Sequence, residues 1–185
     1  MTLTIGVDIG GTKVSAAVVD EDGTLVAHTR RDSPADDAAA MRAATIDVIE
    51  ELARDHSVEA VGVGAAGWID PGRSTVLFAP NIAWRDEPLR EHISAATGLP
   101  AVVENDANVA AWAEFRFGAA RDADDSMVMI TVGTGVGGGI VMRGELLRGA
   151  HGIAAEFGHV LAVAGGHRCG CGREGCIEQY ASGSA

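Results

Sequence analysis

The three cysteines of the chain lie within eight residues of one another near the end of the sequence. Cys169, Cys171 and Cys176 are separated by one and four residues, and glycines stand between them. A structural zinc ion needs side chains whose donor atoms converge to about 2.0–2.3 Å from the metal, and a glycine-rich loop allows that convergence. A disulfide between Cys169 and Cys171 would be strained, because a single residue separates them. Three free thiols are the alternative, but the spacing favours a metal site.

A fourth ligand is needed to close the tetrahedron, and histidine is the residue type available nearby. His159 is the best candidate, with His167 and His151 as rivals. Three cysteines and one histidine are typical of a structural zinc site, since no coordination position stays open for a substrate. The stretch is therefore predicted to hold a structural metal ion.

A second candidate for chemistry is Glu104-Asn105-Asp106, where a predicted strand ends and a predicted helix begins. In open α/β sheets, ligands bind at this carboxyl end of the strands. Asp106 could accept the proton of a substrate hydroxyl during phosphoryl transfer, with Asn105 holding a neighbouring hydroxyl. Asp106 could also be a first-turn acid that stabilises the helix by about 0.5–2 kcal/mol. Taken alone, the position favours the helix cap.

Two glycine turns, residues 10–13 and 133–135, each follow a predicted strand. Glycine lets backbone amides approach a phosphate closely, and Thr12, Lys13 and Thr134 would add side-chain donors. Either turn alone would be an ordinary hairpin, but a pair at equivalent places in two half-repeats favours phosphate binding. The glycines at 133, 135 and 138 also match the dinucleotide-binding spacing, yet a strand follows them where that motif needs a helix.

Hydrophobic periodicity predicts an α/β fold for the elements that position these residues. Antiparallel hairpins come first and feed parallel strands connected by crossover helices. The first helix is expected to begin at a Ser33 cap, with Pro34 at its first position. In chain order, the predicted elements are strands 5–9, 14–20 and 25–29, helix 34–52, strand 58–66, helix 86–97, strand 101–104, helix 106–117, and strands 127–132 and 138–142.

The same pattern predicts two lobes. Residues 1–118 form a complete N-terminal α/β lobe. Residues 119–185 begin again with strand, glycine turn, strand and hairpin, and the second lobe is expected to be incomplete.

The composition excludes several classes of protein. Hydrophobic residues make up 47% and charged residues 22%, which is typical of a soluble globular protein. With 14 basic and 26 acidic residues the net charge is -12, so a nucleic-acid-binding surface is not expected. No apolar run approaches the roughly 18 residues of a membrane span, and the N-terminus lacks the features of a secretory signal. We therefore expect a cytoplasmic protein that binds neither membrane nor nucleic acid.

Together these motifs resemble the ROK family of bacterial sugar kinases and repressors, and within it the zinc-containing, ATP-dependent glucokinases. The resemblance runs in family order along nearly the whole chain. It implies an actin-like (ribonuclease-H-like) fold, with a complete N-terminal lobe, an incomplete C-terminal lobe, and sugar and ATP bound between them. The matching stretches are Asp8–Lys13, Glu104–Ala110, Thr131–Gly139, Glu156–His159 and Cys169–Glu178.

The resemblance also implies a reaction, the Mg²⁺-dependent transfer of a phosphoryl group from ATP to the 6-hydroxyl of a hexose, with glucose as the first choice. Asp106 would be the catalytic base. The other sugar hydroxyls would be bound by Asn81, Asn105, Glu156, His159 and Glu178. The ATP phosphates would face Gly10, Gly11, Thr12, Lys13, Thr134 and Gly135, with Asp8 near the magnesium. His159 would also ligate structural Zn²⁺ with Cys169, Cys171 and Cys176, so that the metal orients a sugar-binding histidine.

Other functions stay open at this point. A ROK repressor would carry a helix-turn-helix module before the first strand, which here begins by Ile5. A non-catalytic, zinc-stabilised sugar-binding fragment is compatible with an incomplete second lobe. A filament-type ATPase of the actin class would have no use for the Glu156–His159 motif and the cysteine loop. Mannose, fructose, allose and N-acetylmannosamine are alternatives to glucose, and the resemblance implies a homo-oligomer.

Overall fold

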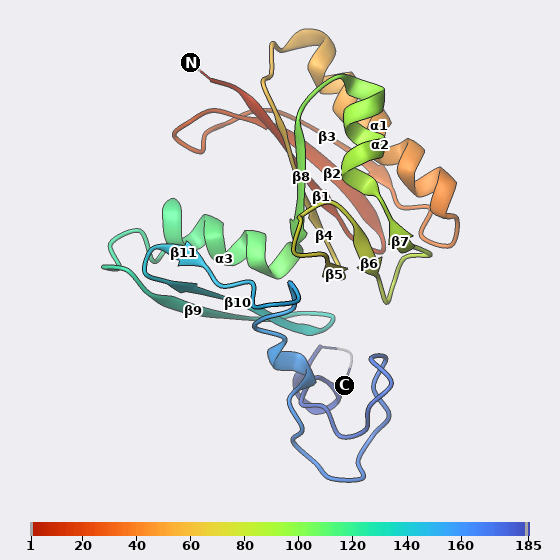
Figure 1. Cartoon of the computed structure of the whole chain (residues 1–185), viewed down its shortest axis with the longest axis vertical. Coiled ribbons are helices and arrows are strands. Elements are labelled where there is room, and N and C mark those ends of the chain that lie inside the picture. Colours follow the sequence, from red (N-terminus) through yellow and green to blue (C-terminus); the bar gives the residue numbers. More distant parts are fainter. Residues whose placement is uncertain (1, 184) are drawn as a thin grey trace. The chain divides into compact units, whose positions relative to one another are not determined.

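The computed structural model describes residues 2–183 and 185 (Figure 1). They group into two compact units, which divide between Asp106 and Ala107. The sequence-based division after residue 118 places helix α3 (Asp106–Arg116) in the first lobe, whereas the structure groups all but its first residue with the second unit. The reason is close packing of α3 on strand β10 (Val136–Met142), where a Cβ added to Gly137 would lie 3.0 Å from the Cβ of Ala107.

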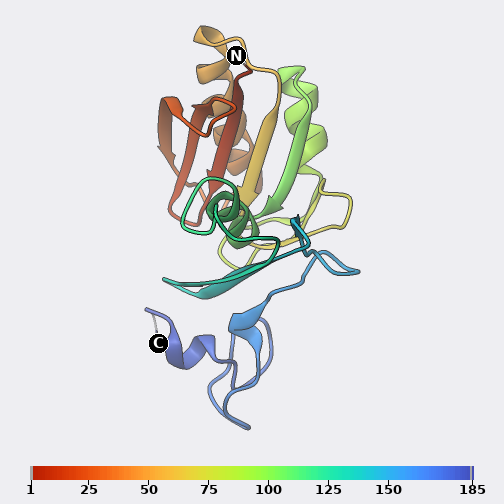
Figure 2. The ribbon, with the colours of Figure 1, turned by 90° about the vertical axis from the view of Figure 1, so that its left-hand side faces the viewer.

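The first unit is built on a five-stranded sheet in the order β3-β2-β1-β4-β8. The first three strands pair antiparallel, and β1, β4 and β8 are parallel, so the predicted order of hairpins followed by parallel strands is confirmed. Figure 2 looks onto these strands, with the helices of the unit behind them. The five strands are β1 (Thr4–Ile9), β2 (Lys13–Val19), β3 (Leu25–Asp32), β4 (Val61–Ala65) and β8 (Ala101–Asn105).

Helix α1 (Ala38–Asp55) packs on β1, β2 and β3 through an apolar stripe at helical spacing. The predicted start at Ser33 is wrong, because the cap is Asp37, whose carboxylate accepts hydrogen bonds from the N–H groups of Ala39 and Ala40 at 2.9 and 3.0 Å. Ser33 instead donates its hydroxyl to the carbonyl of Gly10 at 2.7 Å. The hydroxyl that resembles a helix cap thus closes the first glycine turn.

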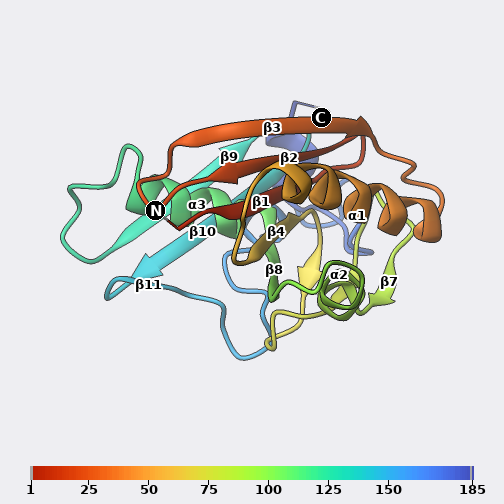
Figure 3. The same cartoon turned by 90° about the horizontal axis from the view of Figure 1, so that it is seen from above.

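Helix α2 (Leu89–Thr97) lies beside α1 on the same face of the sheet (Figures 1 and 3). Its predicted end is confirmed, since Gly98 adopts a left-handed conformation with φ 71° and its N–H caps the carbonyl of Ser94. Its predicted start near Asp86 is wrong. Asp86 belongs to strand β7 (Arg85–Glu87), and Pro88 separates that strand from the helix because the residue before a proline is driven to extended conformations.

A small three-stranded sheet, which the sequence analysis did not anticipate, follows β4. Its order is β5-β6-β7, with β5 at Trp68–Ile69 and β6 at Val76–Phe78. The loop between β6 and β7 carries Asn81 and is held from inside by Arg85, whose guanidinium donates to the carbonyls of Ala79 and Ile82 at 2.9 and 3.2 Å. This sheet therefore shapes the loop on which one expected sugar-binding residue lies.

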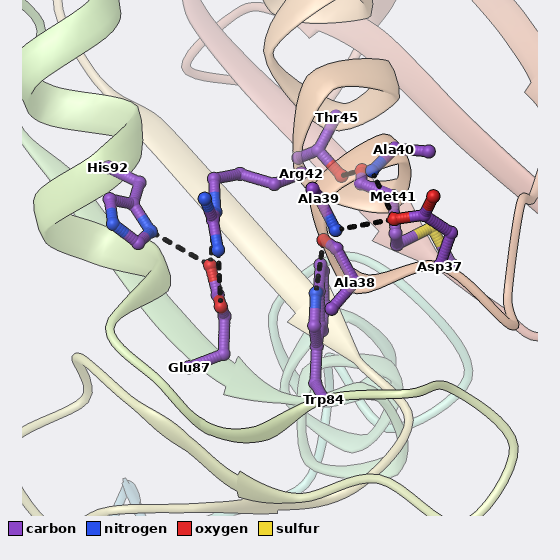
Figure 4. Close-up of polar contacts among 10 residues, drawn as sticks. All are labelled: Asp37, Ala38, Ala39, Ala40, Met41, Arg42, Thr45, Trp84, Glu87 and His92. Atoms are coloured by element: carbon purple, nitrogen blue, oxygen red, sulfur yellow. Dashed lines mark hydrogen bonds and ion pairs between the residues drawn. The ribbon is translucent and has the colours of Figure 1, made fainter.

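An ion cluster around the buried Glu87 ties the same sheet to both helices (Figure 4). Glu87 is 6% exposed. Its carboxylate accepts two hydrogen bonds from Arg42 of α1, at 2.6 and 2.9 Å, and lies 2.8 Å from Nδ1 of His92 in α2. Nearby, the indole N–H of Trp84 donates to the carbonyl of Ala38 at 3.1 Å. These contacts fix the end of the loop that holds Asn81.

The second unit contains α3 and an antiparallel sheet in the order β11-β10-β9. Strand β9 exposes one apolar row, with Val128, Ile130 and Val132 at 62%, 58% and 66%. None of the described helices in either unit is both long and apolar enough to cross a lipid bilayer. The remaining elements are β9 (Met127–Val132), β11 (Glu145–Leu146), the 3-10 helix η1 (Phe157–His159) and α4 (Glu178–Ala181).

Candidate functional site

The junction between β8 and α3 holds the candidate base. Asn105 is the last residue of β8, and its side-chain N–H donates to the carbonyl of Gly67 at 3.1 Å. Asp106 follows as the first residue of α3. Both side chains are only partly buried, so this end of the parallel strands is accessible to a ligand.

Asp8 of β1 lies close enough to Asp106 for the two carboxylates to repel each other. The Asp8 side chain reaches solvent, yet neighbouring protein atoms remove part of its hydration and raise the pKa of its carboxyl, and the charge of Asp106 raises that pKa further. Two carboxylates that repel each other at the carboxyl end of parallel strands suit a hard divalent cation, which takes oxygen ligands. Asp8 therefore lies where a hard cation such as Mg²⁺ would relieve this repulsion.

The first glycine turn packs against the loop that carries Asn81. The N–H of Gly10 donates to the carbonyl of Lys13 at 2.9 Å. A Cβ added to Gly11 would lie 3.2 Å from the Cβ of Asn81, so a larger residue here would crowd the loop that carries Asn81. Thr12 and Lys13 are exposed, and the ammonium of Lys13 pairs with Asp32. The turn thus presents backbone and a cation beside the candidate sugar-binding loop.

The second glycine turn is closed by Glu178. The carboxylate of Glu178 accepts a hydrogen bond from the N–H of Val136 at 2.9 Å, and a Cβ on Gly135 would lie 2.6 Å from the same oxygen. The N–H of Gly133 donates to the carbonyl of Gly135 at 2.9 Å, and Thr134 is exposed at the tip. Glu178 is expected near the sugar, and its hydrogen bond to the backbone of this turn was not predicted from the sequence.

Four side chains form a cluster suited to a metal ion. The ligand atoms of His159, Cys169, Cys171 and Cys176 all lie within 4.8 Å of one another. The rival His167 lies outside the cluster, with its ring against Tyr180 at 5.2 Å, and His151 is exposed. Of the three candidate histidines, the structure therefore brings His159 to the cysteines.

The spacing of these atoms fits tetrahedral zinc. Ligands at about 2.3 Å for sulfur and about 2.0–2.1 Å for nitrogen give tetrahedral edges of about 3.8 Å between two sulfurs and about 3.6 Å between sulfur and nitrogen. The observed distances are 3.7 Å between the sulfurs of Cys171 and Cys176, and 3.6 Å from the sulfur of Cys169 to Nδ1 of His159. Glycine permits the loop, since Gly172 and Gly175 have φ values of 90° and 78°.

The pKa values of the cysteine thiols also indicate a bound cation. Burial and the two neighbouring sulfurs together raise the pKa of Cys176 to about 12. Burial also opposes ionisation of Cys171, but the N–H of Arg173, the two other cysteines and the charge of Arg173 outweigh it and lower the pKa of that thiol. Three thiolates therefore do not coexist here at neutral pH unless a metal ion compensates their charge.

The two ring nitrogens of His159 face different partners. Nδ1 faces Cys169, while Nε2 lies 3.8 Å from a carboxylate oxygen of Glu156. The sulfur of Cys169 is in turn 3.9 Å from the other oxygen of Glu178. A metal bound by Nδ1 would leave Nε2 directed toward Glu156, so the cluster can orient a histidine and two carboxylates together.

Two residues beside the junction, Glu104 and Arg73, received no role from the sequence. Glu104 is 5% exposed and lies 3.5 Å from Nε of Arg73. An acid directly after the apolar run Ala101–Val103, still within the predicted strand, was an available signal, because an isolated carboxylate is rarely buried without a partner. Nothing local marks Arg73, which comes from a turn about thirty residues earlier.

The order of elements in the chain is that of the actin-like ATPase fold, in the form that sugar kinases use. The chain belongs to the ROK family, whose sequence model matches residues 4–185. The resemblance stated from the motifs is thereby confirmed.

Several relatives carry names that bear on function. The chain is 52% identical over 185 residues to a glucokinase of Streptomyces coelicolor, covering 100% of this chain and 58% of that protein. It is 42% identical over 182 residues to an N-acetylmannosamine kinase of Yersinia pseudotuberculosis, covering 98% of this chain and 61% of that protein. The crystal structure of a ROK glucokinase from Streptomyces griseus in complex with glucose and AMPPNP superposes with a TM-score of 0.91 at 54% identity, covering 98% of this chain and 57% of that one. The chain thus spans about three fifths of the length of these relatives.

Proposed function

We propose that this chain is part of an ATP-dependent kinase that phosphorylates a hexose at its 6-hydroxyl, with glucose as the preferred substrate. The observation that supports this most is the 52% identity to a glucokinase over all 185 residues, a range that spans the two glycine turns, the β8–α3 junction and the cysteine loop. The 54% identity to a glucokinase that binds glucose and AMPPNP supports the same choice of sugar and nucleotide.

Asp106 is the proposed catalytic base. A carboxylate of ordinary basicity is sufficient, because phosphoryl transfer depends mainly on positioning and on stabilising charge. Asp106 would take the proton of the sugar's 6-hydroxyl as the hydroxyl oxygen attacks the γ-phosphorus of ATP, the bond from that phosphorus to the bridging oxygen breaks, and ADP leaves. Asn105 would hold a neighbouring hydroxyl. Asn81, Glu156, His159 and Glu178 would bind the remaining hydroxyls.

The phosphates of ATP are proposed to lie against the two glycine turns. Gly10, Gly11, Thr12 and Lys13 would contribute in the first unit, and Thr134 and Gly135 in the second. Asp8 would hold Mg²⁺, which neutralises charge on the transferred phosphoryl group when it is bound. The raised pKa of Asp8 agrees with this role, since a carboxylate that repels its neighbour gains from a nearby cation.

Zinc is the proposed metal of the cluster formed by His159 and the three cysteines. Its contribution would be structural, because the four ligands leave no open coordination position. Bound there, it would fix the ring of His159 and so the side of the ring that faces Glu156. A cytoplasmic location, a place in sugar breakdown and a homo-oligomeric state are proposed with the kinase activity.

The test is glucose-dependent ADP formation with Mg²⁺-ATP by the zinc-loaded chain, compared with Asp106→Ala and Asp106→Asn. We expect both variants to keep glucose affinity within a few fold and to lose at least about 10²-fold in kcat, since they remove the proton acceptor alone. Equal turnover in the variants would remove Asp106 from the mechanism. Glucose binding by wild type without any ADP formation would favour the non-catalytic sugar-binding fragment.

A further inference from the structure

Strand β8 lies at the edge of the five-stranded sheet, and the turn between β5 and β6 reaches its open side. The N–H of Val103 in β8 donates to the carbonyl of Arg73 in that turn at 3.0 Å. Asp70 builds the turn, because its carboxylate accepts hydrogen bonds from three backbone N–H groups of the same turn at 2.6–2.9 Å. Arg73 itself is held in the left-handed region, at φ 56°. The turn is therefore shaped to meet β8 at this residue.

Glu104 of β8 pairs with the charged side chain of Arg73 in this turn. Its carboxylate is almost fully buried, and one oxygen lies 3.5 Å from Nε of Arg73. The other oxygen accepts a hydrogen bond from the N–H of Asn105 at 3.1 Å. A buried carboxylate is tolerated only when it is paired and hydrogen-bonded, and both conditions are met by these two neighbours.

Asn105 is thus held from two sides. Glu104 binds its backbone N–H, and the carbonyl of Gly67 binds its side-chain N–H at 3.1 Å. Gly67 has φ 154°, and a Cβ there would run into the backbone of Phe78, so its carbonyl is fixed as well. With Asn105 fixed, the direction in which Asp106 enters α3 is also set.

We infer that Glu104, kept in place by Arg73, is a positioning residue that sets the backbone at the Asn105–Asp106 junction. The inference rests on the proposed function for its consequence, because the junction carries the proposed base and a proposed sugar contact. Glu104 is proposed to act through Asn105, by the acceptor that its carboxylate offers. A glutamine in its place keeps that acceptor, whereas an alanine removes it.

The first test does not depend on sugar or ATP. Amide hydrogen exchange in wild type is compared with Glu104→Ala and Glu104→Gln, and with Glu50→Ala as a control that removes an exposed glutamate from α1. We expect exchange at the Asn105 amide to become about tenfold faster in Glu104→Ala, because its hydrogen bond to a charged acceptor is lost. Glu104→Gln and the control should stay near wild type. Unchanged protection in Glu104→Ala would overturn the inference. If Glu104→Ala does not fold, Glu104→Leu fills the space without an acceptor and should give the same result.

The second test is glucose affinity by calorimetry on the same variants. Glu104→Ala is expected to bind glucose at least about tenfold more weakly, with recovery in Glu104→Gln. If Glu104 had a purely structural role, both substitutions would lower stability and weaken glucose binding. Recovery of the affinity in Glu104→Gln alone therefore indicates positioning. Wild type that binds no hexose would count against the proposed function, and the exchange experiment would then decide this inference alone. Wild-type affinity in Glu104→Ala would overturn it.

Substitution of Arg73 provides a third, independent test of the inference. Arg73→Ala should speed exchange at Asn105, because the buried carboxylate of Glu104 is left without its partner. Adding Glu104→Gln to that variant should restore protection and the unfolding midpoint, since the uncompensated charge is gone. A double variant that is no better than Arg73→Ala would contradict the proposed pairing.

Discussion

Arg42→Ala is predicted to be among the most destabilising single changes that leave the apolar core intact. The guanidinium of Arg42 makes two hydrogen bonds to Glu87, which is 6% exposed and also contacts His92 (Figure 4). Breaking a buried pair from one side costs about 3–5 kcal/mol, because the remaining charge stays buried. Arg42 itself is about one third exposed, at 32%, so we expect the lower end, about 3 kcal/mol.

The protonation of Glu87 determines how the stability loss in Arg42→Ala changes with pH. Burial opposes its ionisation, but the hydrogen bonds and charges of Arg42 and His92 outweigh burial and lower the pKa of its carboxyl from the ordinary 4.5. This contribution to stability is present above pH 4.5 and is lost as the pH falls through the lowered pKa. In Arg42→Ala only His92 is left to oppose burial, so the pKa of Glu87 is higher than in wild type and the carboxylate takes up a proton more readily on acidification. The difference between variant and wild type should therefore shrink on acidification below about pH 4.5.

The assay is urea unfolding of zinc-loaded protein at pH 7 and at pH 4, with two comparisons. Arg42→Ala/Glu87→Gln should recover a large part of the loss at pH 7, because the uncompensated charge is removed. Arg31→Ala breaks an exposed pair with Glu51 and should cost far less, as exposed ion pairs contribute little. A loss at pH 7 no larger than that of Arg31→Ala, or one that stays constant down to pH 4, would refute the reasoning.

Three further predictions concern packing, metal and charge. Gly139→Ala should cost about 1–3 kcal/mol in thermal unfolding, because its Cβ would overlap that of Ala111, whereas Gly62→Ala meets no atom within 4 Å and should be tolerated. A chelator, or Cys176→Ser, should remove close to one equivalent of zinc by elemental analysis and lower the unfolding midpoint of the second unit; an unchanged midpoint would show that the loop folds without metal. Asp8→Asn should stabilise the Mg²⁺-free chain at pH 7 and not at pH 3, because it removes a carboxylate whose pKa is raised in the folded state, and a destabilised variant would contradict this.

Much of the first sheet could be read from the sequence, because its strands are short apolar runs bounded by glycine and turn residues. The end of α2 at Gly98 could also be predicted, since glycine is the residue that best tolerates the left-handed conformation of a helix cap. The start of α1 was not. Ser33 followed by proline has the local chemistry of a cap, but a partner distant in sequence, the carbonyl of Gly10, uses its hydroxyl and leaves Asp37 to cap the helix.

The small sheet β5-β6-β7 escaped prediction for a different reason. Its strands are two or three residues long, too short for any periodicity, and they are held by pairing and by side chains such as Arg85. The cysteine cluster was predictable in composition, because thiols interleaved with glycine have few other uses. His159 was already preferred to its rivals, and the fold brings its 3-10 helix η1 beside the loop.

The most direct test of hexose kinase activity is to mix the purified zinc-loaded chain with glucose and Mg²⁺-ATP and to follow the reaction by ³¹P NMR. Transfer to the 6-hydroxyl predicts a new phosphomonoester signal that couples to the two protons on carbon 6 and grows as the γ-phosphate signal of ATP declines. Release of inorganic phosphate alone would mark an ATPase that uses water as the acceptor. That outcome would contradict the proposal that Asp106 delivers a sugar hydroxyl to the phosphate.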